Sequence, residues 1–335
     1  MSNLRTLSFA LFALAATRAL ANDSTAELAA GGITFLKDPD IAMRSEDLSI
    51  SAKQVHIVYE FANKASADKT ALVAFPMPDI EGAVDFTVGV PDGPDDNPFA
   101  FAVTSDGQPV TPTLDEHAFF KGVERTAELR KLGVPLRPYL PATQEALDKL
   151  DAATKKRLVD QEMAYVDETS TSVDGPVERH LIGLWTYRSA FTWKQTFPAG
   201  KSLRLEQSYK PGVGSTVGTG VGAPGWRTRE DAKGYPAKYC IDRDFEQSVA
   251  AVMRKKKADY PPFSEQRIDY ILTTGANWAG PIGDFHLTID KGQPNYLLSL
   301  CADGIVKTGP TRFELRKKDF TPSRDLNILI LTPNP

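Results

Sequence analysis

The chain has 335 residues, of which 41% are hydrophobic and 24% are charged, and it contains 24 glycines and 24 prolines. This composition excludes a disordered chain and a small module held together by disulfides. The formal net charge of -4 gives no electrostatic reason to expect a nucleic-acid partner, and two cysteines are too few for a Cys-rich metal cluster. We therefore expect one large domain or two medium ones, without a metal or a cofactor.

The first 21 residues have the pattern of a secretory signal peptide. Arg5 gives a positive start, residues 7–16 are an apolar run, and Ala19-Leu20-Ala21 is the small-x-small pattern that signal peptidase cleaves. The apolar run is about half as long as a helix that crosses the roughly 30 Å hydrocarbon core, so it predicts cleavage between Ala21 and Asn22 and no membrane anchor. Removal of the segment leaves a net charge of -6. We expect an exported protein, periplasmic in a Gram-negative bacterium and otherwise secreted.

Export affects the expected oxidation state of the two cysteines, Cys240 and Cys301. In an oxidising compartment with no other thiol in the chain, they are expected to form one disulfide. Closing a loop of this length would stabilise the fold by roughly 4 kcal/mol on the chain-entropy estimate. The competing interpretation is a pair of free thiols or a redox pair, although a catalytic dithiol usually has the shorter Cys-x-x-Cys spacing.

Alternation of apolar and polar residues predicts that β-strands dominate the mature chain. Strands are expected at residues 55–61, 86–90, 99–103, 268–272, 285–289, 296–300 and 326–331. Residues 185–197 and 203–209 are expected to form a hairpin around the Ala199-Gly200 turn. The pattern predicts a mainly β (α+β) fold, an antiparallel β-sandwich-like body with two β-rich halves, 22–115 and 166–335. A doubly wound nucleotide-binding sheet is disfavoured.

Helical character is concentrated in an insertion at 116–165, which is rich in Glu, Lys, Leu and Ala. Two helices are expected there, the second beginning near Thr143. A further helix is expected at 242–257 in the C-terminal half, with acids in its first turn and four consecutive basic residues in its last. The basic run is interpreted as a solvated helix end, with a basic binding patch as the alternative.

Residues 211–225, with the sequence PGVGSTVGTGVGAPG, form a Gly-rich stretch. The Gly-Lys-Ser/Thr of a phosphate-binding loop is missing, and Ser215 lacks the glycines of a nucleophile elbow. The stretch is interpreted as a flexible surface loop, and a mobile lid over a ligand site is the functional alternative.

Few residues suggest catalysis. Asp284 and His286 lie two residues apart on an expected strand, so they should project from the same face, where a carboxylate could orient an imidazole. A polar pair on the solvent face of a sheet needs no function, however. The run Asp115-Glu116-His117 is interpreted as the acidic start of a helix, with a metal site as the alternative. The spacing of the four histidines matches no metal motif.

Several short sequence segments, taken together, resemble a bacterial protein family known as domain of unknown function 4424. They lie at residues 22–32, 43–51, 59–63, 75–78, 193–198, 239–240 and 273–278. The resemblance covers nearly the whole mature chain and implies export and a bacterial source, with no catalytic residue to transfer. The strand at 59–63 and the Phe75-Pro76-Met77-Pro78 phrase are also similar to the N-terminal β-sandwich module of inter-alpha-trypsin-inhibitor-like proteins.

Asn277 and Trp278 lie within one of these segments, 273–278, in an expected connection between two strands. An amide beside a large aromatic ring is a common way to contact a carbohydrate or a peptide, so the pair is a candidate binding surface, with loop packing as the alternative.

The sequence thus favours an exported envelope protein with a non-catalytic role, binding a protein or a glycan. The alternatives are a periplasmic hydrolase that uses Asp284 and His286 near the Gly-rich stretch and a structural assembly subunit.

Overall fold

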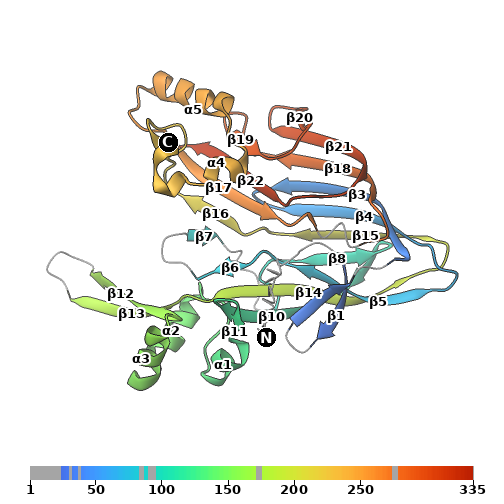
Figure 1. The fold of residues 1–335 in the computed structure, drawn as a ribbon, viewed down its shortest axis with the longest axis horizontal. Helices are drawn as coiled ribbons and strands as arrows, with labels where there is room; N and C mark the ends of the chain where they lie inside the picture. Colours follow the sequence, from blue (N-terminus) through green and yellow to red (C-terminus); the bar gives the residue numbers. More distant parts are fainter. Residues whose placement is uncertain are drawn as a thin grey trace, which may run out of the picture.

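The computed structural model describes residues 24–29, 32–36, 39–82, 87–89, 96–170, 176–273 and 278–334. The predicted signal peptide and its cleavage site between Ala21 and Asn22 lie outside these residues. The fold is mainly β, with several antiparallel sheets and few helices, as predicted (Figure 1).

The largest sheet has eight strands and takes them from both sides of the helical segment. Its order is β20 (Val306–Lys307), β21 (Arg312–Phe320), β18 (Ile282–Asp290), β3 (Ile41–Ser51), β4 (Val55–Asn63), β15 (Ser202–Tyr209), β8 (Ala102–Ser105) and β9 (Gln108–Val110). β3 and β18 pair in parallel, whereas the other neighbours are antiparallel. Strands far apart in the sequence are therefore joined in one layer.

One face of this sheet is apolar because each strand alternates with a period of two. Leu287, Leu48 and Ile57 lie opposite one another on β18, β3 and β4, and each is 0% exposed. The opposite face carries charged and polar side chains, among them His56, Glu206 and Asp284, and faces solvent.

A seven-stranded and a five-stranded sheet complete the body. The seven-stranded sheet has the order β11 (Val123–Glu124), β10 (Thr113–Phe120), β14 (Thr186–Phe197), β5 (Lys69–Pro76), β1 (Ser24–Ala29) and β2 (Gly32–Leu36), and β6 (Ile80–Glu81) also pairs with β14. The five-stranded sheet has the order β19 (Leu297–Leu300), β22 (Leu326–Pro333), β17 (Phe263–Tyr270), β16 (Val213–Thr216) and β7 (Thr87–Gly89).

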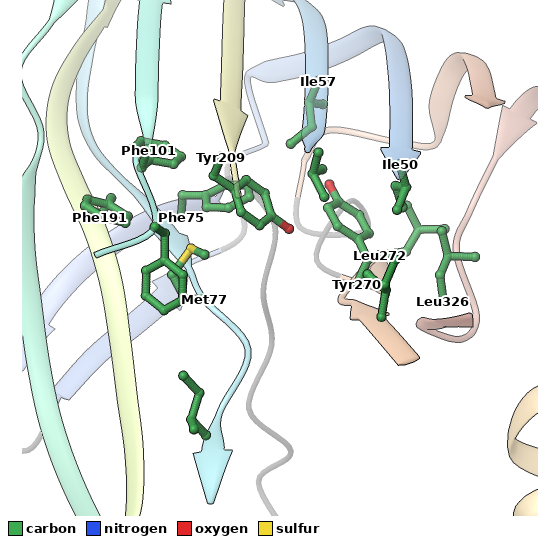
Figure 2. Packing of buried hydrophobic residues seen from close by; sticks show 14 of the residues in the cluster. Ile50, Ile57, Phe75, Met77, Phe101, Phe191, Tyr209, Tyr270, Leu272 and Leu326 are labelled. Carbon is green, nitrogen blue, oxygen red and sulfur yellow. The ribbon is translucent and has the colours of Figure 1, made fainter. Parts of the chain in front are cut away.

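Figure 2 shows how the layers meet in one hydrophobic core. Phe101 stacks on Phe191 of β14 with ring centroids 4.4 Å apart, and Phe75 lies 5.2 Å from Phe101 and 5.5 Å from Tyr209. Tyr270, Leu272 and Leu326 form a neighbouring group in the same buried cluster. Rings of this kind bury the most apolar area per residue, so they dominate the packing between the sheets.

One face of the five-stranded sheet packs on this large core, and its other face is covered by a second, smaller hydrophobic core. Phe263, Leu329 and Leu331 pack there against Val249 of α5 (Arg243–Lys256) and Trp226. Two short 3-10 turns, η1 (Trp226–Thr228) and η2 (Glu230–Ala232), and helix α4 (Tyr235–Tyr239) complete this cover. The predicted disulfide between Cys240 and Cys301 is present and joins the end of α4 to the residue after β19.

Helix α5 was predicted correctly because its signals are local. The Asp242 carboxylate accepts a hydrogen bond from the Phe245 N–H at 2.8 Å, so it caps the helix as expected for that residue type. In the insertion there are three helices rather than two: α1 (Thr126–Lys131), α2 (Pro141–Asp148) and α3 (Ala152–Asp160). The predicted second helix is divided because Asp151 leaves the helical conformation and caps α3 through the Thr154 N–H.

Two other expectations are wrong. β14 and β15 do not form a hairpin, because they belong to different sheets and the chain crosses from one layer to the other at Ala199-Gly200. Both strands alternate strongly, and each buries its apolar face toward the common core instead of pairing edge to edge. His117 lies in the middle of β10, not at a helix start.

A two-stranded hairpin, β12 (Ala164–Ser170) and β13 (Val177–Gly183), follows α3 and extends away from the body, as Figure 1 shows. Within the described part of the chain, none of the helices is both long and apolar enough to span a membrane.

Candidate functional site

A pocket of about 310 Å³ lies where the seven-stranded sheet, helix α2 and the β12–β13 hairpin meet. It is lined by residues 80–82, 138–141, 144, 165, 167 and 181–183. Concave sites with apolar walls and a few polar groups are the usual form of ligand-binding sites, so this pocket is the candidate functional site.

Two glycines bring the backbones together at the base of the pocket. A Cβ on Gly82 would lie 2.3 Å from the carbonyl oxygen of Gly183, so no larger residue fits there. The Gly82 N–H donates to the Trp185 carbonyl at 3.0 Å, and the buried Trp185 indole donates to the Leu136 carbonyl at 2.7 Å. The sheet and the segment before α2 are therefore fixed to each other on this side.

The second wall is the segment from Arg137 to the start of α2. The Arg137 guanidinium is 7% exposed, and its Nη2 lies 2.8 Å from Glu116 Oε1. The Tyr187 hydroxyl donates to the same Glu116 oxygen at 2.8 Å. Because this buried ion pair is hydrogen-bonded to a third group, it holds the backbone that carries Pro138 and Tyr139.

Asp148 at the end of α2 joins the helix to the hairpin. Its Oδ1 accepts the Leu181 N–H at 2.8 Å, and its Oδ2 lies 2.8 Å from His180 Nδ1. The hydrogen bond to Asp148 raises the pKa of His180. The contacts of the Asp148 carboxylate with His180 and with the Leu181 N–H thus keep β13 against α2.

The interior of the pocket combines acids, an amide and tyrosines. Glu81 and Asp167 are the lining carboxylates, and within the described part of the chain neither makes a hydrogen bond or an ion pair through its side chain. The pocket is also lined by Gln144, Tyr139 and Tyr165. Burial raises the pKa of Tyr139 to about 12, so its hydroxyl is neutral at physiological pH.

Such a lining can accept hydrogen bonds from hydroxyl or ammonium donors, while the tyrosine rings offer flat apolar surfaces. Among the described residues, the lining carries two carboxylates and no lysine or arginine. Repulsion from these carboxylates makes the site poorly suited to an anionic ligand.

Asp284 and His286 lie on the outward face of the eight-stranded sheet, but each has other partners. The Lys318 ammonium donates to Asp284 Oδ2 at 2.7 Å and is the main cause of the lowered pKa of Asp284. His286 Nδ1 lies 3.3 Å from Asp47 Oδ1, and His286 Nε2 lies 3.5 Å from Glu314 Oε2. The Gly-rich stretch belongs to the five-stranded sheet, on the other side of this layer, so the structure does not bring it to the pair.

The expected aromatic binding surface is not exposed. Trp278 is 1% exposed, and its ring lies 4.6 Å from that of Phe61 and 6.2 Å from that of Phe197. The Ala279 N–H donates to the Ile41 carbonyl, which directs the preceding indole into the core. Asn277 lies outside the described residues.

The Gly-rich stretch 211–225 also differs from the expected surface loop. Val213–Thr216 is strand β16, which pairs with β17 and β7. Val221 and Ala223 are buried in the smaller core, and the backbone at Gly222 has a φ of +79° close to Val249. Tertiary pairing and packing thus override the low strand propensity of the glycines.

The pocket itself was not predicted. Its residues come from four segments separated by many positions in the sequence, and no local pattern links them. The nearest signal is the Pro138-Tyr139-Leu140-Pro141 phrase, in which two prolines fix an extended turn before a helix.

The fold and the site define a mainly β, disulfide-containing protein with a ligand-sized pocket between a sheet and a helical insertion. The chain belongs to the family described as Domain of unknown function (DUF4424), whose model matches residues 21–329. A crystal structure of a "putative nutrient binding protein" from Legionella pneumophila is similar at 16% sequence identity, with a TM-score of 0.45, over 93% of this chain and 70% of that chain. No curated protein matches the sequence.

Proposed function

We propose that the protein is exported to the bacterial cell envelope, where it binds a small glycan fragment without chemical conversion. The observation that carries the binding role is the pocket beside α2, in which two carboxylates without intramolecular partners in the described chain lie near tyrosines and an amide. Sugar hydroxyls donate well to carboxylates, and the apolar face of a sugar ring packs on aromatic side chains.

Export is supported by the pattern of residues 1–21, with cleavage between Ala21 and Asn22. The Cys240–Cys301 disulfide agrees with an oxidising compartment, where such bonds persist.

The binding role is tested by titrating the mature protein with mono- and oligosaccharides of bacterial envelope polymers, measured by calorimetry. We expect saturable binding that Asp167→Asn weakens, because an amide oxygen is a poorer acceptor than a carboxylate oxygen. Loss of a hydrogen bond to a charged group should lower the affinity by about 1.5–3 kcal/mol, which is roughly 10- to 100-fold.

Asp303→Asn is the matched control, since it removes the same charge at an exposed residue outside the pocket. Equal loss of binding in both variants would assign the effect to net charge. If none of the sugars bound, a glycan ligand would be rejected. If the wild type converted a sugar chemically and Asp167→Asn abolished that conversion, the non-catalytic role would be rejected.

A further inference from the structure

The C-terminal end of α5 presents four consecutive cations to solvent: Arg254, Lys255 and Lys256 in the last turn and Lys257 at the C-cap. Cations at a helix C-terminus interact favourably with the macrodipole, but the effect decays within one turn and needs only one or two of them. None of the four makes an ion pair with a carboxylate in the described part of the chain, and Lys256 donates to a backbone carbonyl, that of Asn334. Their charge is therefore largely uncompensated.

A chain of hydrogen bonds leads from Lys256, through Asn334 and Ser264, to the exposed hydrophobic residue Val217. Ser264 Oγ lies 2.7 Å from Asn334 Oδ1 and 3.2 Å from the carbonyl oxygen of Val217, whose exposed fraction is 95%. Tyr260 follows the helix closely and is 61% exposed. Figure 1 places α5 and the C-terminus at the same end of the molecule. We call the group formed by residues 254–257, Val217 and Tyr260 the basic end surface.

The charge of this surface is opposite to that of the whole chain, which has a formal net charge of -4. The exposed acidic residue beside it in the sequence, Asp259, offsets only part of the positive charge. A partner attracted to the surface is consequently anionic. A soluble polyanion would explain the cations but not the exposed valine and tyrosine beside them.

We propose that the basic end surface docks on the anionic headgroups of a phospholipid bilayer. Lysine and arginine near an anionic bilayer gain electrostatic attraction, and tyrosine is favoured at the boundary between headgroups and acyl chains. Val217 and Tyr260 would enter that boundary while the cations remain among the headgroups. The contact would be peripheral and reversible, since a few residues bury little apolar area.

The test is co-sedimentation of the mature, full-length protein with vesicles of phosphatidylcholine, with and without phosphatidylglycerol. We expect binding only to vesicles that contain phosphatidylglycerol, and weaker binding as salt concentration rises. Each cation contributes about fivefold, from roughly 1 kcal/mol near an anionic surface, so Arg254→Gln/Lys255→Gln/Lys257→Gln should lower the partition coefficient about 100-fold.

Lys53→Gln/Lys64→Gln/Lys201→Gln is the matched control, because it removes three exposed cations from other parts of the surface. The control should bind about as tightly as the wild type, and so about 100-fold more tightly than the α5 variant. Val217→Ser/Tyr260→Ser should weaken binding without changing its salt dependence, and thermal melting checks that each variant is folded.

Three outcomes would overturn the proposal. These are no binding to phosphatidylglycerol vesicles, equal loss in the two triple variants, and unchanged binding of Val217→Ser/Tyr260→Ser together with equally tight binding to soluble polyphosphate. The last result would identify a site for polyanions and not for lipid.

Discussion

The Cys240–Cys301 disulfide gives a quantitative test of how the C-terminal half is held together. The two cysteines are 61 residues apart in the sequence. In the chain-entropy model, a cross-link over this loop reduces the freedom of the unfolded chain and stabilises the fold by about 4 kcal/mol. We expect Cys240→Ser/Cys301→Ser to lower the free energy of unfolding by that amount.

We expect the native structure around the disulfide to be retained when the disulfide is removed. The loss of stability should therefore arise from the greater conformational freedom of the unfolded chain. Ser299 Oγ donates to the Tyr239 carbonyl at 2.8 Å, and the Ile241 N–H donates to the Pro236 carbonyl at 2.9 Å. The first of these hydrogen bonds keeps the end of α4 against β19 and the second closes the turn that follows α4, and neither needs the sulfur bridge.

The backbone at Cys240 provides an internal control. Its φ of 50° lies in the left-handed region, which costs a residue with a side chain roughly 1–2 kcal/mol relative to glycine. Cys240→Gly/Cys301→Ser should therefore be about 1 kcal/mol more stable than Cys240→Ser/Cys301→Ser. Both variants lack the disulfide and differ only in this backbone preference.

The assay is urea unfolding of the oxidised wild type and the two variants, followed by tryptophan fluorescence and far-UV circular dichroism. The slope of free energy against urea should rise in the variants, because an unfolded chain without the cross-link exposes more surface. A double-serine variant within 1 kcal/mol of the wild type would refute the loop-closure argument. A glycine variant no more stable than the serine variant would refute the backbone argument.

Three further predictions concern pH, the pocket and export. His117 has its pKa raised to about 9, first by its hydrogen bond to Asp115, so its stabilising contribution is complete below about 6.5 and is lost as the pH rises through about 9. The difference in unfolding free energy between the wild type and His117→Gln should fall by about 1 kcal/mol over this range, allowing for solvent screening, and a difference that grows with pH would contradict it. Gly82→Ala should lower stability by about 1–3 kcal/mol because its Cβ would meet the Gly183 carbonyl, whereas Gly218→Ala, with open space around it, should unfold at nearly the wild-type temperature. N-terminal sequencing of the exported protein should begin at Asn22, and an uncleaved Met1 would exclude the signal peptide.

Local signals in the sequence were sufficient for some elements and insufficient for others. Helix α5 could be predicted because its cap at Asp242 and its terminal charges are adjacent in the chain. The residues of a strand and its neighbours in the sequence do not determine which sheet the strand joins. β14 and β15 have the same alternation on either side of a tight turn, and only the packing of both inward faces on a shared core separates them into two sheets.

The same reasoning explains why the predicted site residues and the observed pocket differ. Trp278 was a candidate for a binding surface because an amide beside a large aromatic ring is common in binding loops, with loop packing as the alternative. Its ring is instead part of the core, since contact with Phe61 and Phe197 removes a large apolar area from water. The pocket depends on Gly82 and Gly183, whose function is visible only when their backbones meet.

The two proposed sites lie on separate additions to the β core, which makes their tests independent. The pocket is built from β6, α2 and the β12–β13 hairpin against the seven-stranded sheet, whereas the basic end surface belongs to α5 and the end of the five-stranded sheet. Substitutions at distant sites that share no partners have additive effects. Asp167→Asn should therefore leave vesicle binding unchanged, and the α5 triple variant should leave sugar binding unchanged. If either substitution altered both activities, glycan and bilayer would be contacting one continuous surface, and the two assignments would have to be merged.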